Sequence, residues 1–343
     1  MALLPFGSPP TPDSTTTKKG KIKLAGDLTG TADLPTIKTS VALGGSPTTT
    51  TQTAGDSSTK IATTAYVDNV QRQPSGRLCL TSGEPVANTA KNAKTVVYFT
   101  PYKGNTISLY DGSLWQTIAF TEKSISLASA TADSNYDIFG YLNAGALALE
   151  KLIWTDGTTR ATALAWQDGM YVKSGDATRL YLGTIRITDT TGQTAMNATH
   201  MYVWNYFNRV VYTLTITDNA SHTYQSATPR QWNANTANQA NAVIGVLEDT
   251  INVGWVAQIA SGIAGANASV RMTLDSYTTV VAIIGGGGAT NMSVDTSKIG
   301  NAGTIKHQTI ITPGYHYFAL TEQSTNTNLA TFASVVGTVG IMG

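Results

Sequence analysis

The sequence predicts a mainly β protein, in which an extended N-terminal arm and one short helix precede antiparallel β-sandwich or barrel modules. Short runs of alternating apolar and polar residues recur from residue 76 onward, separated by Gly, Asp and Asn. Charged residues are only 13% of the chain, about half the usual ~25% share, and β-branched and neutral residues take their place. Six of the eleven prolines lie before residue 57, so the first part of the chain differs in composition from the rest.

Residues 1–56 are expected to form an extended arm. Prolines interrupt runs of Thr and Gly there, and such a stretch buries too little apolar surface to fold alone. We therefore expect it to become ordered on a partner. The arm carries a basic cluster that is either a solvated patch or a contact with an acidic neighbouring protein; its members are Lys18, Lys19, Lys21 and Lys23.

Residues 57–74 are predicted to contain a short helix. Ser57, Ser58 or Thr59 can cap its start, and Pro74 prevents its continuation. A helix of about a dozen residues is marginal alone in water, so its apolar stripe must pack on the next domain or on copies of itself. Self-association is favoured, because the arm offers no core. The candidate oligomerisation residues are Ile61, Ala62, Ala65, Tyr66 and Val70.

The remaining chain is predicted to form β modules over residues 76–230 and 231–343. A hairpin is expected over 106–120, with Asp111-Gly112 at its turn. Clean alternation occurs at 208–218, 251–260 and 269–276. Residues 146–154 could be a short helix, but their setting favours a strand. The boundary is placed near residues 225–240, where the Asn-rich run TPRQWNANTANQAN interrupts the alternation.

Composition and charge exclude several classes of protein. The net charge of +1 lacks the basic excess of a nucleic-acid-binding protein, so no nucleic-acid partner is expected. Cys79 is the only cysteine, which rules out a disulfide or a Cys-based zinc site within one chain and suits assembly in a reducing cytoplasm. The start of the chain does not read as a signal peptide, and no apolar run approaches the ~18 residues of a membrane span, so no membrane insertion is expected.

No catalytic, cofactor-binding or metal-binding residue is predicted. The four histidines lack metal-binding spacing, and His316 is expected as a packed residue on a strand. The glycine run at 283–290 is not followed by GK[ST], so it is interpreted as a loop. Acids beside glycines are attributed to turns, namely Asp111, Asp156, Asp168 and Asp176. Surface positions are expected for Glu150, Glu248 and Glu322, although a glycosidase carboxylate pair cannot be recognised from sequence spacing.

The tryptophans offer a second kind of site, because flat rings stack on sugars. Most of the six lie in strand-like runs and are expected in the core. Trp232, in the Asn-rich segment, is predicted to be exposed and is the candidate receptor contact.

Four blocks resemble tailed-bacteriophage fibre proteins and related virion proteins. The first joins KKGKIKLAGDLTGTADLPTI to AGDSSTKIATTAYVDNV over residues 18–70. The others are GRLCLTSGEPV with VVYFTPYKGNTISLYDGSLWQTIAF, then TRATALAWQDGMYVKSGDATRLYLGTIRIT with TGQT and YVWNYFNRV, and finally PGYHYFALTEQS. Together they cover well over half the chain. One departure is AMNATHM at 195–201, where an acidic stretch would be expected.

The resemblance implies a location in the virion, assembly in the bacterial host cytoplasm, β-rich modules and a homotrimer. The expected function is that of a non-enzymatic, fibre-type structural protein that projects from the particle and contributes to host attachment. The arm would then dock on other virion proteins, and the β modules would contact a host glycan or protein. The alternatives are a capsid head fibre, a decoration protein or a tail adaptor, and, less favoured, a polysaccharide depolymerase.

Overall fold

The computed structural model describes residues 28–30, 35–37, 49–50, 60–61, 73–248, 250–261, 266–277, 290–294, 300–301, 307–324 and 330–343. The chain divides into two units, Met1–Val67 and Asp68–Gly343. In the first unit, β1 (Leu28–Gly30) pairs antiparallel with β2 (Pro35–Ile37).

Most of the predicted attachment and helix residues lie outside the described ranges. This holds for Lys18, Lys19, Lys21, Lys23, Ala62, Ala65, Tyr66 and Val70. Ile61 is described, is 66% exposed and belongs to neither a helix nor a strand. The arm and the oligomerisation helix therefore stay predictions.

The second unit is nearly all β, which confirms the predicted fold class. Within the described ranges the only helical element is the 3-10 turn η1 (Trp232–Ala234). Almost every strand pair is antiparallel, as expected for a chain with clean period-2 alternation.

The unit begins with a three-stranded sheet and a hairpin. The sheet has the order β3 (Gly76–Cys79), β5 (Val96–Pro101), β8 (Lys123–Ser126), and the hairpin joins β6 (Thr106–Tyr110) to β7 (Trp115–Ala119). The Asp111 carboxylate accepts the backbone N–H groups of Ser113 and Leu114, each over 2.8 Å, and Gly112 has φ +103°. The predicted hairpin and its turn are therefore confirmed.

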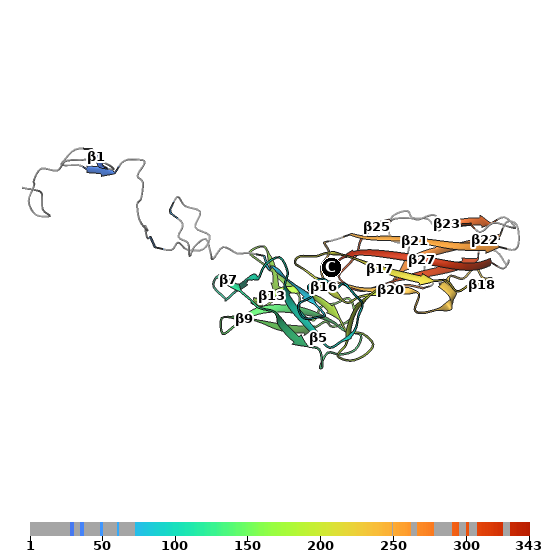
Figure 1. The fold of residues 1–343 in the computed structure, drawn as a ribbon, viewed down its shortest axis with the longest axis horizontal. Helices are drawn as coiled ribbons and strands as arrows, with labels where there is room; N and C mark the ends of the chain where they lie inside the picture. The colour runs from blue at the N-terminus through green and yellow to red at the C-terminus, as the bar shows by residue number, and fades with distance from the viewer. Residues whose placement is uncertain are drawn as a thin grey trace, which may run out of the picture. The chain divides into compact units, whose positions relative to one another are not determined.

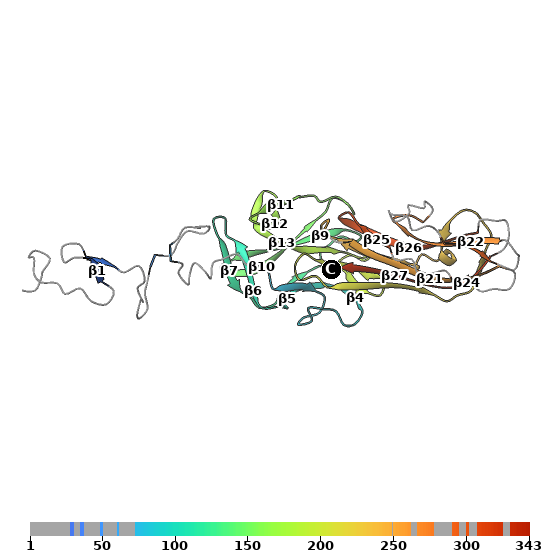
Figure 2. The same ribbon diagram turned by 90° about the horizontal axis from the view of Figure 1, so that it is seen from above.

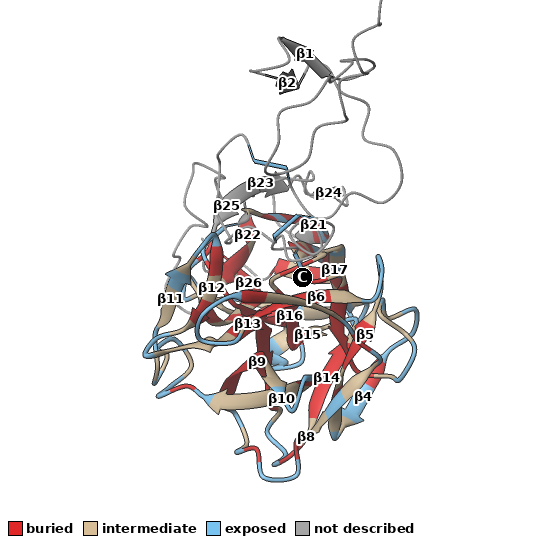
Figure 3. Ribbon diagram, turned by 90° about the vertical axis from the view of Figure 1, so that its left-hand side faces the viewer, coloured by how far each residue is buried: buried red, intermediate tan, exposed pale blue. Residues whose placement is uncertain are grey.

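A six-stranded sheet follows, and it carries the candidate site. Its order is β10 (Ala146–Ile153), β9 (Asn135–Asn143), β13 (Asp176–Arg186), β12 (Met170–Lys173), β11 (Leu164–Gln167), with β16 (Val203–Asn205) also paired to β13. The strand preferred for residues 146–154 is confirmed. The central strands β9 and β13 are mostly buried, whereas the edge strands β10 and β11 are mostly intermediate or exposed (Figure 3).

An eight-stranded sheet draws its strands from distant parts of the sequence. Its order is β23 (Thr290–Val294), β22 (Ala266–Leu274), β26 (Gly314–Ser324), β20 (Gln239–Ile244), β15 (His200–Met201), β14 (Thr194–Asn197), β4 (Lys91–Lys94), and β19 (Arg230–Gln231) also pairs with β26. The pair β15–β20 is parallel.

A second six-stranded sheet is built around the C-terminal strand. Its order is β17 (Val211–Asp218), β27 (Ala330–Met342), β21 (Thr250–Ser261), β24 (Gly300–Asn301), with β18 (His222–Tyr224) on β27 and β25 (His307–Ile310) on β21. Figure 1 shows β17, β27 and β21 side by side. The alternation predicted for β21 is confirmed, because Ile251, Val253, Trp255, Ala257 and Ile259 are all 5% exposed or less.

This sheet packs face to face with the eight-stranded sheet as a sandwich (Figure 2). The two layers are so close at Gly337 that a Cβ atom there would lie 2.8 Å from Met272 Cε and 3.1 Å from Leu320 Cδ1. Phe318, Leu320 and Phe332 are fully buried in this core. Close interdigitation of this kind is typical of sandwich cores.

The predicted division at residue 230/231 does not coincide with the sheets. Strands β17 and β18 precede it and yet pair with β27 at the end of the chain. The segment interpreted as a boundary is a compact turn: Asn238 Nδ2 donates to Asp218 Oδ2 over 2.7 Å and to the Trp232 carbonyl oxygen over 3.0 Å. Asparagine side chains here replace the strand ladder as hydrogen-bond partners, which is why the alternation stops.

Candidate functional site

The candidate site begins with the turn between β11 and β12. Asp168 and Gly169 both have positive φ, +49° and +87°, and Gln167 pairs with Met170. Two central residues with positive φ are the mark of a type I′ hairpin turn, for which Asp-Gly is a favoured sequence. The turn predicted at Asp168 is thus present, and its register places Trp166 directly opposite Tyr171 on one face of the sheet.

Trp166 is an exposed ring supported from behind by other rings. It is 60% exposed on the edge strand β11, and its ring centroid lies 4.5 Å from that of Tyr171 at an interplanar angle of 76°. Tyr171 in turn lies 5.4 Å from Tyr206. We call Trp166, Tyr171 and Tyr206 the Trp166 face. Edge-to-face contacts hold the indole in place, so the ring is presented to solvent with little freedom to lose on binding.

Charges beside the Trp166 face are paired with one another. Arg209 Nη2 lies 2.8 Å from Glu248 Oε2, and burial, together with the Glu248 charge, raises the pKa of Tyr206 to about 12. Tyr206 therefore stays protonated at neutral pH.

A second paired group lies farther across the same sheet. Lys173 Nζ and Arg179 Nε contact the two oxygens of Glu150 at 2.9 and 2.6 Å. Burial alone would raise the pKa of Glu150, but the hydrogen bonds from Lys173 and Arg179 lower it overall. Because the charged groups near the Trp166 face are paired with one another, a ligand would be recognised there by stacking and hydrogen bonding more than by net charge.

The prediction that Trp232 is exposed is wrong. Trp232 is 0% exposed, and its ring packs at 83° against both His222 and Phe332, with centroid distances of 5.2 and 5.4 Å. The Asn-rich segment around it suggested a loop, but the segment folds over the sandwich edge and inserts its one large apolar ring. Trp232 is therefore not available as a receptor contact in this conformation.

Trp166 is the tryptophan that sequence reasoning missed. Its strand-like run predicts a core position, yet Trp166 is 60% exposed, whereas the other five tryptophans are all 9% exposed or less. The strand is only four residues long and lies at a sheet edge. The short alternating run ahead of an Asp-Gly turn indicates a hairpin strand. It does not show that this strand lies at the edge of the sheet, because that depends on the order of strands in the sheet.

The three glutamates expected at the surface have different surroundings. Glu248 is exposed and Glu150 is half-buried. Glu322 corrects the prediction, because it is 1% exposed and its oxygens contact His222 Nε2 at 2.5 Å and Arg230 Nε at 2.7 Å. An ion pair of this kind lets a carboxylate lie inside the fold. His316 is buried on β26, as expected, with Nδ1 2.7 Å from Asp275 Oδ2.

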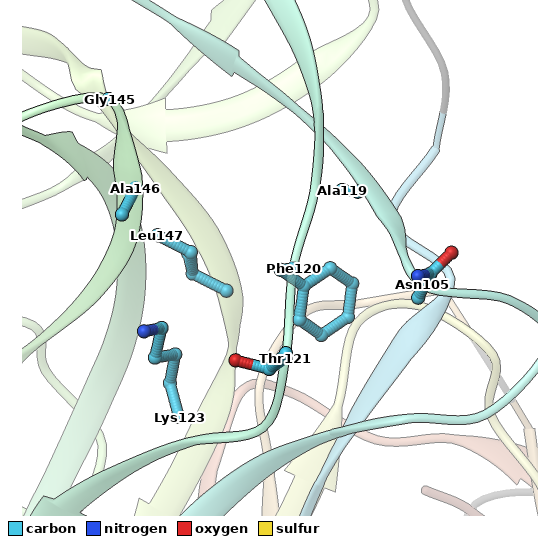
Figure 4. A pocket seen from close by; sticks show the side chains of 8 residues that line it. All are labelled: Asn105, Ala119, Phe120, Thr121, Lys123, Gly145, Ala146 and Leu147. Carbon is cyan, nitrogen blue, oxygen red and sulfur yellow. The ribbon is translucent and has the colours of Figure 1, made fainter.

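A surface pocket lies between the end of the β6–β7 hairpin and the β9–β10 turn (Figure 4). Its lining is Asn105, Ala119, Phe120, Thr121, Lys123, Gly145, Ala146 and Leu147. Lys123 is the one charged residue among these, so the pocket does not bring an acid and a base together.

Two further properties concern the described ranges only. They contain no group of three His, Cys, Asp or Glu side chains placed to hold a metal ion. None of their helices has the length and apolarity needed to cross a membrane.

The fold and the site define a β-sandwich protein with an exposed, ring-supported tryptophan on an edge strand. A family model described as "Repeat of unknown function (DUF5907)" matches residues 12–68. A search of the curated proteins found no match.

Solved structures with partial likeness include three different proteins. The VP2 subviral particle of infectious bursal disease virus is 11% identical over 74% of this chain and 71% of that chain, with a TM-score of 0.29. The insecticidal delta-endotoxin Cry8Ea1 of Bacillus thuringiensis is 8% identical over 78% and 51%, with a TM-score of 0.25. Latent PorU of Porphyromonas gingivalis is 7% identical over 62% and 20%, with a TM-score of 0.27. Likenesses at this level carry no argument about function.

Proposed function

We propose that this chain is a fibre-type structural protein of a bacteriophage virion, which projects from the particle and contributes to host attachment through the Trp166 face. The observation that carries the attachment role is the 60% exposure of Trp166, set against 9% or less for the other five tryptophans. Exposure of a large apolar ring to water is unfavourable in free energy, and burial of that ring against a ligand would be favourable. The resemblance of the four sequence blocks to fibre proteins supports the virion setting.

The scaffold suits this role because it is rigid and depends little on charge. Continuous strands cross the sandwich, including the 13-residue β27 and the 12-residue β21. Repeated copies on one particle would raise a weak contact at each Trp166 face to a firm attachment by multivalency. The protein acts in this proposal by binding and not by catalysis.

The remainder of the proposal concerns assembly. The arm of residues 1–56 docks on other virion proteins, with Lys18, Lys19, Lys21 and Lys23 as candidate contacts. The segment 57–74 joins three copies of the chain. A trimer would place three Trp166 faces on one fibre, which is the arrangement that multivalent attachment requires.

Two measurements test the proposed function. Electron microscopy of particles labelled with antibody against this chain should show density on a tail appendage; density on the head would favour a head fibre or decoration protein, and unlabelled particles would contradict the virion setting. Purified chain should compete with the phage for host cells. Trp166→Ala should lose that competition, and Val211→Ala, which alters a 68% exposed residue on another sheet, should keep it.

A depolymerase would reveal itself by turnover. Released oligosaccharide after incubation of the purified chain with host capsule or lipopolysaccharide, abolished by a single Asp or Glu substitution, would contradict the non-enzymatic role.

A further inference from the structure

A row of polar and aromatic side chains crosses the eight-stranded sheet. Tyr317 on β26 is paired with Asn241 on β20, Asn241 with His200 on β15, and His200 with Asn197 on β14. Residues paired in register lie on the same face of a sheet, and strands are about 4.8 Å apart, so this row extends over roughly 15 Å. We call these four residues, with Tyr277 and Gln239, the tyrosine–amide row.

The row lies on the face of the sheet that points away from the sandwich core. Along β26, Phe318 and Leu320 are fully buried, and Leu320 reaches toward Gly337 of the opposite sheet. Tyr317 alternates with these residues and is only partly buried. Side chains of neighbouring residues in a strand point to opposite faces, so Tyr317 and its in-register partners lie on the face away from the sandwich core. Tyr317, His200 and Asn197 are partly exposed there, whereas Asn241 is only 3% exposed.

One end of the row is a stacked pair of tyrosines. The rings of Tyr277 and Tyr317 lie 4.9 Å apart with an interplanar angle of 28°, and Tyr277 is 36% exposed. The Tyr277 hydroxyl donates to Gln239 Oε1 over 2.7 Å, which fixes the tilt of the outer ring. The pair therefore offers a flat, oriented aromatic surface beside the amides.

The amides of the row are held in one orientation. Asn241 Oδ1 accepts from the Tyr315 hydroxyl over 2.8 Å and from Gln239 Nε2 over 2.9 Å. Asn197 Nδ2 donates to Asn92 Oδ1 over 2.6 Å, which continues the chain of amides onto β4. Groups oriented before a ligand arrives lose little entropy when it binds.

Two polar atoms in the row are left for a ligand. Within the described part of the chain, the Tyr317 hydroxyl and His200 Nε2 have no hydrogen-bond partner, whereas His200 Nδ1 lies 3.2 Å from Asn197 Oδ1 and 3.0 Å from Thr199 Oγ1. Burial lowers the pKa of His200, so the ring is neutral near pH 7. A proton on Nδ1 satisfies Asn197 and leaves Nε2 as an acceptor.

The members of the tyrosine–amide row are uncharged, so the row is suited to a neutral ligand. Nearby Asp275 is already engaged, since its carboxylate accepts the backbone N–H of Tyr317 over 3.0 Å and lies 2.7 Å from His316 Nδ1. A phosphate or a carboxylate would find no cation among the row members. A ligand with flat apolar faces and many hydroxyl groups, each able to donate and accept, matches rings and amides together.

We propose that the tyrosine–amide row is a binding site for a neutral polysaccharide chain laid across the strands, with one sugar ring stacked on the Tyr277–Tyr317 pair and hydroxyl groups bonded to Tyr317, His200 and Asn197. Asn241 lies beneath this surface and aligns the side chains around it. Segment 195–201 supplies both His200 and Asn197. The site uses none of the Trp166 face and stands whether or not that face serves attachment.

Affinity electrophoresis of the full chain tests this site. Gels containing dextran, mannan or galactan serve as neutral probes, and alginate serves as the acidic one. We expect retardation in at least one neutral gel. Tyr317→Ala should weaken it about tenfold or more, and Tyr317→Phe should weaken it less, because it keeps the ring and loses the hydroxyl. Tyr102→Ala is the matched aromatic control, because Tyr102 is 37% exposed and follows β5, outside the eight-stranded sheet, so it should leave retardation unchanged.

Several outcomes would overturn the proposal. They are no retardation in any neutral gel, retardation in alginate alone, and retardation lost in Trp166→Ala but kept in Tyr317→Ala. If Tyr317→Ala lowers the melting temperature, Tyr277→Ala replaces it as the test variant, because the Tyr277 ring is more exposed. A Tyr277→Ala protein that is retarded as strongly as the wild-type chain would then contradict the proposal. Failure of this site leaves particle labelling and host-cell competition unaffected, so it is distinguishable from failure of the proposed function.

Discussion

The indole N–H of Trp115 donates to Asp168 Oδ2 over 2.9 Å. This bond joins the β6–β7 hairpin to the β11–β12 turn, 53 residues farther along the chain. That turn sets the register of Trp166 against Tyr171, so a buried tryptophan in one hairpin supports the exposed tryptophan of another.

Asp168→Ala should lower the melting temperature modestly at pH 7, and less in acid. Hydrogen bonds from Trp115 and Gln167 lower the pKa of Asp168. A lowered folded-state pKa contributes stability above the unfolded value of about 3.9, which is lost as pH falls through the folded pKa. Because Asp168 is exposed, solvent screening keeps the effect small. Melting curves of both proteins from pH 7 to pH 2.5 check this, and a difference independent of pH would contradict it.

Asp137→Ala should be strongly destabilising, by about 3–5 kcal/mol. Arg160 Nε donates to Asp137 Oδ2 over 2.7 Å, and the side chains are only 14% and 2% exposed. Removal of the carboxylate leaves a buried guanidinium without its counter-charge. Asp176→Ala is the matched control, since its partly exposed contact with Arg179 at 3.8 Å should cost no more than about 1 kcal/mol. Urea denaturation measures both, and equal losses would refute the distinction.

Gly183→Ala should destabilise the protein by about 1–3 kcal/mol, whereas Gly340→Ala should be nearly neutral. A Cβ atom at Gly183 would overlap the Trp204 carbonyl oxygen and lie 2.9 Å from Leu78 Cδ1. At Gly340 the nearest atom, Asn252 Cβ, is 3.8 Å away, which is ordinary contact. Thermal melting of the two variants should separate them clearly. A stable Gly183→Ala protein would show that β16 does not approach β13 as described.

Acrylamide quenching should report essentially one accessible tryptophan. Trp166 is 60% exposed and the other five are 9% or less. Trp166→Phe should therefore remove most of the quenchable fluorescence, and Trp232→Phe should leave it in place. The reverse result would restore Trp232 as the exposed ring and remove the basis of the Trp166 face.

Light scattering on the intact chain should give about three times the 36.1 kDa chain mass. Ala65→Glu would place a charge on the apolar stripe of segment 57–74 and should release monomers. A monomeric wild-type chain would defeat the trimer and the role of this segment in it.

Several features followed from local sequence. The strands at 208–218 and 251–260 were predictable because period-2 alternation fixes which side chains face the core, as Leu214 and Ile259 illustrate. The turns at Asp111-Gly112 and Asp168-Gly169 were predictable, because Gly112, Asp168 and Gly169 have positive φ angles that Asp and Gly tolerate better than most residues. These are properties of a few adjacent residues.

The sequence by itself therefore determined the β class, the strand periods and the turn positions, and it left the site open. Trp166 and Trp232 both lie beside polar residues, yet one is at a sheet edge and the other closes the sandwich. Asn241 and Tyr317 are 76 positions apart in the chain and become partners only through the order of strands in the sheet. Tertiary structure decided exposure and alignment, because both depend on which strands become neighbours, and pairing between distant segments leaves little mark in local sequence.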